Sequence, residues 1–258
     1  IANRERMNIQ YLFHDGDIID DEPNIKEWEQ ADAAYQMLDN AGVPYGILAG
    51  NHDVGGLRED YGNYSTYFGE SRYNHNAWYG GSYQDNRGHY DLITVDGIDY
   101  MGWGIGDEEI QWMNDVLAQY PERKAILNFH EYLLASGGLG EEPQRIYDEV
   151  VSKNENVCLV LSGHYHNAYS RVDTFTNADG SERKVYSLLF DYQGLPEGGM
   201  GYMRLMHFDL DGQKVIFRTY SPSLDDYDAK ASAVENEGND YVVPDANING
   251  EETFEISF

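Results

Sequence analysis

Four short apolar runs in this chain each end in a cluster of polar residues, and this repeated pattern constrains the fold more than any other feature of the sequence. The runs, which have the length of buried strands, are 8–14, 45–49, 125–129 and 157–161. A helix is predicted between the first two runs, from an N-cap at Asn24 to a stop at Gly42, with apolar residues from Ile25 to Leu38 at the spacing of one buried face. Strand, helix and strand in this order form a βαβ unit, and its polar tips are expected at one sheet edge.

Two more helices and three hairpin turns complete the predicted order of elements. Apolar side chains at helical spacing follow Asp107 until Pro121, and a further helix is predicted over 143–151. The hairpin turns, each between strand-like runs, are Asp96-Gly97, Asp179-Gly180 and Asp211-Gly212. The mixture of βα units and hairpins predicts an α/β protein in which two packed sheets are flanked by helices.

The charge of the chain excludes several classes of partner. Its 258 residues include 46 acidic and 17 basic side chains, which gives a formal net charge of −29. Such a field repels phosphate backbones and anionic lipids, so neither nucleic-acid wrapping nor docking on membrane surfaces is expected. No apolar run approaches the roughly 20 residues that a membrane span needs. The single cysteine, Cys158, lies in an apolar run and is predicted to be buried.

One domain over residues 1–222 is predicted, because layered α/β domains commonly reach about 250 residues. Residues 223–258 contain ten acidic side chains and only one lysine. This acidic segment is predicted to wrap the same domain and to end with 254–258 as an edge strand.

The polar clusters contain oxygen and nitrogen donors just beyond the predicted strand ends. These donors are Asp17, Asn51, His130, His164 and His166. Alone, an Asp-Gly-Asp sequence is most often a turn and a single histidine most often a hydrogen-bonded core residue. The His164-Tyr165-His166 pair is more informative, because on a strand both imidazoles point to one side. Together, the four clusters favour a metal site.

These motifs resemble those of one family in order and spacing. Gly16-Asp17-Ile18-Ile19-Asp20, Gly50-Asn51-His52-Asp53, His130 and Gly163-His164-Tyr165-His166 are similar to the motifs of calcineurin-like metallophosphoesterases. Further similarity, at 38–54, 78–83 and 191–194, points to a secreted bacterial branch of the family. The resemblance implies a four-layer α-β-β-α sandwich of two mixed sheets flanked by helices.

By the same resemblance the protein is a phosphoric ester hydrolase that uses two divalent metal ions, with a hydroxide bridging them as nucleophile. Asp17 would bridge the ions, Asn51, His130 and His164 would bind one of them, and His166 the other. His52 would protonate the leaving group, and Asp53 would hold its ring. Asp, Asn and His donors suit Mn, Fe and Zn alike, and the sequence leaves open whether monoesters or diesters are the substrates.

One family element does not occur in the sequence. The family begins with a strand that bears Asp-x-His, and no histidine here has an aspartate two residues before it. Since a βαβ unit needs about 30 residues, the first strand is expected upstream of Ile1. The chain is accordingly predicted to be truncated at its N-terminus and to lack normal activity as given.

A long aromatic segment over 61–90 is a candidate for substrate selection. Trp78 and Tyr79 in it, together with Tyr192, are candidate substrate-binding residues that could stack on a sugar or a base. The alternative is that these rings only attach a long irregular segment to the sheets.

Two other functions remain possible at this stage. The first is a non-catalytic module that keeps the scaffold and binds a ligand or glycan, and the second is a metal-dependent amidase on a different fold. The family resemblance and the acidic composition predict an extracellular or cell-surface location.

Overall fold

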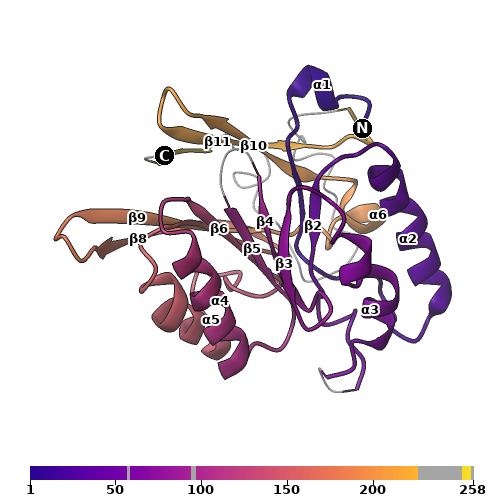
Figure 1. Cartoon of the computed structure of the whole chain (residues 1–258). Helices are drawn as coiled ribbons and strands as arrows, with labels where there is room; N and C mark the ends of the chain where they lie inside the picture. Colours follow the sequence, from indigo (N-terminus) through magenta and orange to yellow (C-terminus); the bar gives the residue numbers. More distant parts are fainter. Residues whose placement is uncertain (57–58, 94–96, 226–251, 257–258) are drawn as a thin grey trace. The chain divides into compact units, whose positions relative to one another are not determined.

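The computed structural model describes residues 1–56, 59–93, 97–225 and 252–256. Figure 1 shows their helices and strands. The chain divides into two compact units. Unit 1 contains residues 1–131 and 141–157, and unit 2 contains residues 132–140 and the chain from Cys158 onward.

Unit 1 begins with the predicted strand, helix and strand. After a short helix α1 (Arg4–Met7), strand β1 (Leu12–His14) is followed by helix α2 (Ile25–Asn40) and strand β2 (Tyr45–Ile47). Strands β1 and β2 pair in parallel, with Phe13 opposite Gly46. Because both strands run in the same direction, the polar residues that follow them emerge at the same end of this small sheet.

A second, mixed sheet in unit 1 has the strand order β3-β4-β5-β6. Its strands are β3 (Tyr79–Tyr83), β4 (Gly88–Leu92), β5 (Gly97–Met101) and β6 (Ala125–Phe129). The first three strands are antiparallel, whereas β5 and β6 are parallel and connected through helix α4 (Asp107–Gln119). Strand β6 is buried along its whole length and ends directly before His130.

The remaining helical segments of unit 1 are short. They are α3 (Gly62–Phe68), the 3₁₀ turn η1 (Glu70–Arg72), α5 (Glu141–Ile146) and the π-helical turn η2 (Tyr147–Val151). Aromatic rings dominate the core between α2, α3 and the sheets. Trp28 of α2 is fully buried, stacks on Tyr67 at 5.8 Å between ring centroids and donates its indole N–H to the Glu22 carbonyl at 2.7 Å. This contact ties α2 to the loop that follows β1.

Unit 2 consists mainly of strands. Strand β7 (Val157–Ser162) starts at the unit boundary, runs parallel to β9 (Glu182–Phe190), and β9 pairs antiparallel with β8 (Ala168–Thr176). After helix α6 (Pro196–Gly199), a second sheet follows the order β10-β11-β12 and is antiparallel throughout. Its strands are β10 (Met203–Asp209), β11 (Lys214–Tyr220) and β12 (Glu252–Glu255).

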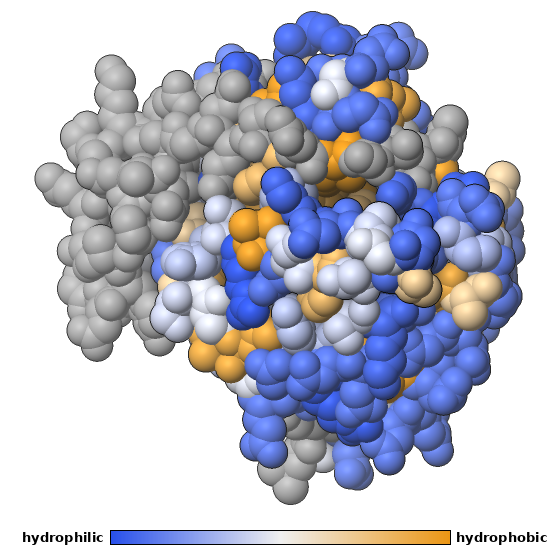
Figure 2. Space-filling model, turned by 90° about the vertical axis from the view of Figure 1, so that its left-hand side faces the viewer, coloured by the Kyte–Doolittle hydropathy of each residue, from blue (hydrophilic) through white to orange (hydrophobic). Residues whose placement is uncertain are grey.

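The surface turned to the viewer in Figure 2 is largely hydrophilic, with hydrophobic residues in small separate areas. In the part of the chain that the structure describes, no helix has the length and apolar character to cross a bilayer.

Most predicted elements are present, and the α/β class with mixed sheets is confirmed. The turns at Asp179-Gly180 and Asp211-Gly212 join β8 to β9 and β10 to β11. The Asp96-Gly97 turn lies partly outside the described residues, although Leu92 and Gly97 pair across β4 and β5. The predicted edge strand at 254–258 overlaps β12, which begins two residues earlier, and residues 257–258 lie outside the described part of the chain. The domain limits 1–222 and 223–258 stay a prediction.

Two local predictions on α2 are wrong. The Asn24 side chain does not cap the helix by accepting a backbone N–H, since its amide donates to the Glu27 carboxylate at 2.7 Å. Ile25, expected on the buried face, is 44% exposed. Glu27 instead accepts the backbone N–H groups of Asp20 and Asp21, both at 2.9 Å, so this first turn serves the loop after β1.

Replacing Trp28 by alanine is expected to destabilise the protein by about 3–5 kcal/mol, because a fully buried ring and its hydrogen bond are both lost. Met37→Ala on the same helix, at a side chain 61% exposed, is the matched control and should change stability by less than about 0.5 kcal/mol. Urea unfolding measures both values. Equal effects of the two substitutions would contradict the packing described for α2.

Candidate metal centre

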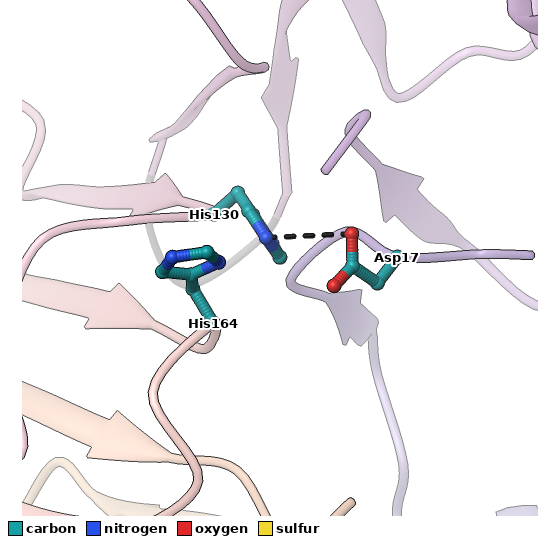
Figure 3. Close-up of side chains that lie close together, drawn as sticks. All are labelled: Asp17, His130 and His164. Atoms are coloured by element: carbon teal, nitrogen blue, oxygen red, sulfur yellow. Dashed lines mark ion pairs between the residues drawn. The ribbon is translucent and has the colours of Figure 1, made fainter. Parts of the chain in front are cut away.

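Three of the predicted metal ligands meet in unit 1. Asp17 follows β1, Asn51 follows β2 and His130 follows β6. His130 Nε2 lies 3.4 Å from Asp17 Oδ1 and 3.0 Å from Asn51 Oδ1, and Figure 3 shows the first of these contacts as a dashed line. His130 is only 2% exposed. Three strand ends that are far apart in sequence therefore bring an imidazole, a carboxylate and an amide together.

The protonation of His130 makes this cluster suited to a cation. Its Nδ1 lies 2.7 Å from the Asp15 carbonyl oxygen, and because a carbonyl only accepts hydrogen bonds, Nδ1 carries the proton. In the neutral ring Nε2 then presents a lone pair toward the Asp17 and Asn51 oxygens. Three electron-pair donors that converge in this way fit a divalent metal ion, and Asp17 and His130 are both among the side chains able to hold one.

Two glycines make the close approach of these side chains possible. A Cβ atom on Gly50 would lie 2.1 Å from Asp17 Oδ1 and 2.7 Å from His130 Cε1. A Cβ on Gly16 would lie 2.5 Å from His130 Nδ1, and Gly16 has a φ of 92°. Asp17 itself has a φ of 52°, in the left-handed region that non-glycine residues rarely adopt. Such strain is typical of residues held in place for function.

The Asp53 carboxylate links the loops that follow β1 and β2. It is fully buried and accepts backbone N–H groups from Gly50 at 2.7 Å, from Ile18 at 2.9 and 3.0 Å, and from Ile19 at 3.1 Å. Burial raises the pKa of Asp53 to about 7, although these hydrogen bonds oppose the shift. The prediction that Asp53 holds the His52 ring is corrected, because its oxygens bind the backbone of both loops.

Asp20 is the ring partner of His52. The Asp20 carbonyl oxygen lies 2.6 Å from His52 Nδ1, and one oxygen of its carboxylate lies 3.5 Å from the same nitrogen. The hydrogen bond to this carbonyl, helped by nearby carboxylates, raises the pKa of His52, while partial burial opposes the shift. Asp20 belongs to the Gly16–Asp20 motif. The sequence does not show its contact with the His52 ring, because that contact depends on how the loop after β1 folds toward residue 52.

His164 and His166 lie in unit 2, immediately after β7. They are on a bend and not on a strand, so the argument that strand alternation turns both rings to one side does not apply. His164 has a φ of 66°, again in the left-handed region. Both rings are half-buried, and their role as metal ligands stays a prediction.

The three aromatic residues proposed for substrate binding differ in their surroundings. Trp78 and Tyr79 are half-buried and pack against the aromatic core of unit 1, where Trp78 contacts Tyr73 at 6.3 Å between centroids. Their substrate role stays a prediction. Tyr192 is only 5% exposed, and its hydroxyl lies 3.3 Å from Thr219 Oγ1 and accepts from Arg204 Nε at 3.0 Å. Tyr192 is therefore a core residue of unit 2, and its contact with substrate stays a prediction.

A second histidine lies beside the cluster and is not protonated at neutral pH. His14, the last residue of β1, accepts the Gly16 N–H at Nδ1 over 3.3 Å and packs edge-on against Tyr35. Burial, followed by the neighbouring His130, lowers the pKa of His14 to about 4. Its backbone carbonyl accepts a hydrogen bond from the fully buried Asn128 of β6 at 3.2 Å, which fastens β1 to β6.

Comparison with known proteins identifies the class to which this fold and site belong. Residues 2–168 match the family model described as calcineurin-like phosphoesterase, so the chain belongs to the calcineurin-like phosphoesterase family. This confirms the family expected from the four motifs. The match to the secreted bacterial branch and the missing Asp-x-His motif stay predictions.

Two similar proteins are informative. The chain is 50% identical over 230 residues to the uncharacterized protein YvnB of Bacillus subtilis (strain 168), covering 87% of this chain and 18% of that protein. The chain thus spans less than a fifth of this curated relative. The crystal structure of a dimetal phosphatase from Danio rerio aligns with a TM-score of 0.53 and 13% identity, over 84% of this chain and 83% of that one. At this identity the similarity establishes the fold.

Asp53→Asn is expected to destabilise the metal-free protein by about 1–3 kcal/mol, because the amide NH₂ would face a backbone N–H that now donates to a carboxylate oxygen. Urea unfolding in EDTA measures the change. Asp21→Asn, at an exposed carboxylate near the same loop, is the control and should shift stability by less than about 0.5 kcal/mol. Unchanged stability of Asp53→Asn would show that the two loops do not depend on this carboxylate.

The stability of the metal-free protein should depend on His14 below pH 6.5. The folded state holds the pKa of His14 at about 4, below the ordinary 6.5, so the unfolded chain binds the proton more readily. The stability that the folded protein gains from a neutral His14 is complete above pH 6.5 and decreases as the pH falls toward 4. Since Asp53 titrates with the opposite sign, His14→Gln is compared with the parent at each pH. The difference in unfolding free energy between His14→Gln and the parent should change between pH 6.5 and 4. A constant difference would contradict the lowered pKa of His14.

Proposed function

We propose that this chain is the catalytic part of a metal-dependent phosphoric ester hydrolase. The observation that carries the proposal is that His130 Nε2 lies beside the oxygens of both Asp17 and Asn51. Membership of the calcineurin-like phosphoesterase family supports the same activity. The dimetal phosphatase with a similar fold supports the proposal of two ions, whose identity is Mn, Fe or Zn.

In this proposal Asp17, Asn51 and His130 hold metal within unit 1, and His164 and His166 of unit 2 complete the ligand set. The support for the two unit 2 histidines is their place in the family motif Gly163-His164-Tyr165-His166. When bound, the ions would activate a water as nucleophile and neutralise charge on the phosphoryl oxygens. The fixed proton on His130 Nδ1 keeps the ring in the tautomer that a ligand requires.

His52 is proposed to donate the proton to the leaving oxygen. Its Nδ1 proton is held by the Asp20 carbonyl, so the ring can release or accept a proton only through Nε2. The raised pKa of His52 increases the fraction of molecules in which this ring is protonated, and a general acid must be protonated to act. The backbone N–H of His52 donates to Asp17 Oδ1 at 3.1 Å, which fixes the acid next to the metal ligand.

Several finer points belong to the proposal. Whether monoesters or diesters are preferred depends on parts of the site that the motifs do not specify. The location outside the cell stays a prediction that follows from the family branch. Since the chain spans 18% of its Bacillus subtilis relative, an activity of the complete protein is likewise a proposal.

The test compares His52→Ala with the parent protein in manganese-supplemented hydrolysis of an aryl phosphate monoester and the matching diester. His52→Ala should lower kcat by about 10²–10⁴-fold, as expected for the loss of a general acid, while bound metal stays unchanged. His75→Ala, at an exposed histidine of the same unit, is the control and should retain full activity. Metal content is measured in each sample by elemental analysis.

Asp17→Asn distinguishes metal binding from proton donation, because this variant should lose bound metal as well as activity, whereas His52→Ala should lose activity alone. Normal turnover by His52→Ala would refute the assigned acid. If a chain extended upstream through the expected Asp-x-His strand binds metal but hydrolyses neither ester, a ligand- or glycan-binding module on the same scaffold becomes the better hypothesis.

A further inference from the structure

Strand β8 of unit 2 lies at one end of the strand order β7-β9-β8, so among the described strands it has a neighbour on one side only. Figure 1 shows β8 and β9 as a long hairpin. Two large hydrophobic side chains on β8 are exposed, Val172 by 54% and Tyr169 by 38%. An edge strand with exposed hydrophobic side chains is a place where another strand can add to the sheet.

The hydrogen bonds to β9 show which residues of β8 point toward the open edge. At the two ends of the hairpin, Asn177 N–H donates to the Ser181 carbonyl at 2.8 Å and Asp191 N–H donates to the Asn167 carbonyl at 2.9 Å. Both β8-side residues have odd numbers, and hydrogen-bonding residues alternate along an antiparallel strand. The N–H and C=O groups of Val172 and Thr174 therefore point away from β9, toward the edge.

The sequence of β8 is complementary to itself about Val172. When two copies are aligned antiparallel with Val172 opposite Val172, Arg171 lies opposite Asp173 of the partner subunit. The same alignment places Tyr169 opposite the partner's Phe175. We propose that the β8 edge binds the β8 edge of a second copy of this chain in this register, and forms a symmetric dimer through a continuous sheet.

Charge selects this register over its neighbours. A shift by two residues keeps the alternation of hydrogen bonds but places Arg171 opposite Arg171, or Asp173 opposite Asp173, and like charges directly opposite are unfavourable. In the centred register Arg171 and Asp173 are non-hydrogen-bonded pairs, in which the strands approach to about 4.5 Å between Cα atoms. The 2.8 Å ion pair between Arg171 and Asp173 within one strand becomes part of a four-charge network.

The local charge of the hairpin also favours this surface over others. With a net charge of −29, two copies of the chain repel each other over most of their surface. Residues 168–190 contain three acidic and three basic side chains, so the hairpin has no net charge. Two hairpin edges can therefore approach without the repulsion that opposes contacts elsewhere on the surface. Added salt should strengthen the dimer, because it screens the repulsion between the negative charges on the rest of the two copies.

The first experiment uses two charge variants of the full chain, Arg171→Asp and Asp173→Arg. The parent should pass from monomer to dimer between micromolar and sub-millimolar concentration in sedimentation velocity, as expected for a small interface. Each variant alone places like charges opposite each other and should weaken association at least about tenfold. An equimolar mixture should restore the dimer, because two Asp side chains then face two Arg side chains.

Restored association in the mixture also shows that both variants are folded. A parent that stays monomeric throughout, variants that associate as well as the parent, or a mixture that does not associate would each overturn the proposal.

A second experiment tests the register. Val172→Cys places the new thiols opposite each other, about 5.5 Å apart between Cα atoms, which a disulfide can span. Mild oxidation should therefore produce a covalent dimer on non-reducing gels. Thr176→Cys, four residues along the same strand, is the matched control and should not cross-link, because its counterpart lies at the far end of the paired strands. Equal cross-linking of the two variants, or none at Val172→Cys, would overturn the register.

Discussion

The candidate metal centre depends on one buried carboxylate. Asp53 accepts backbone N–H groups from the loop that carries Asp17 and from the loop that carries Asn51, so two segments more than thirty residues apart are fastened at a single point. These N–H groups would otherwise be buried without an acceptor, and an unsatisfied donor is costly in the interior. The positions of both proposed metal ligands therefore follow from a side chain that is not among the proposed ligands.

Much of this arrangement could be predicted from the sequence. The apolar runs and their polar ends identified the strands, the donors and the family, because strand composition and strand-end chemistry are local properties. The grouping of Asp17 and Asn51 followed from the rule that parallel strands end at the same edge of a sheet, whereas His130 follows β6 of the second sheet in unit 1. These expectations needed no knowledge of loop conformation.

Other features depend on backbone geometry that the sequence pattern does not encode. Asp53 and Asp20 were expected in other roles or in none. The Asp53 carboxylate binds backbone N–H groups and the Asp20 carbonyl binds the His52 ring, and both contacts depend on a loop with positive φ angles at Gly16 and Asp17. The exposure of Ile25 depends on which side of α2 meets the aromatic core, and helical spacing alone fits either choice. Tyr192 looked suited to ligand binding, but its hydroxyl is used inside unit 2.

Both histidines with assigned roles in unit 1 are oriented by backbone carbonyls, His130 by that of Asp15 and His52 by that of Asp20. Every amino acid supplies the same carbonyl oxygen, so sequence drift at positions 15 and 20 can change the side chain and still leave both imidazole tautomers as they are. A mutational scan would then underestimate how much these two positions contribute. Their contribution lies in the path of the main chain, which evolution can alter only by reshaping the loop.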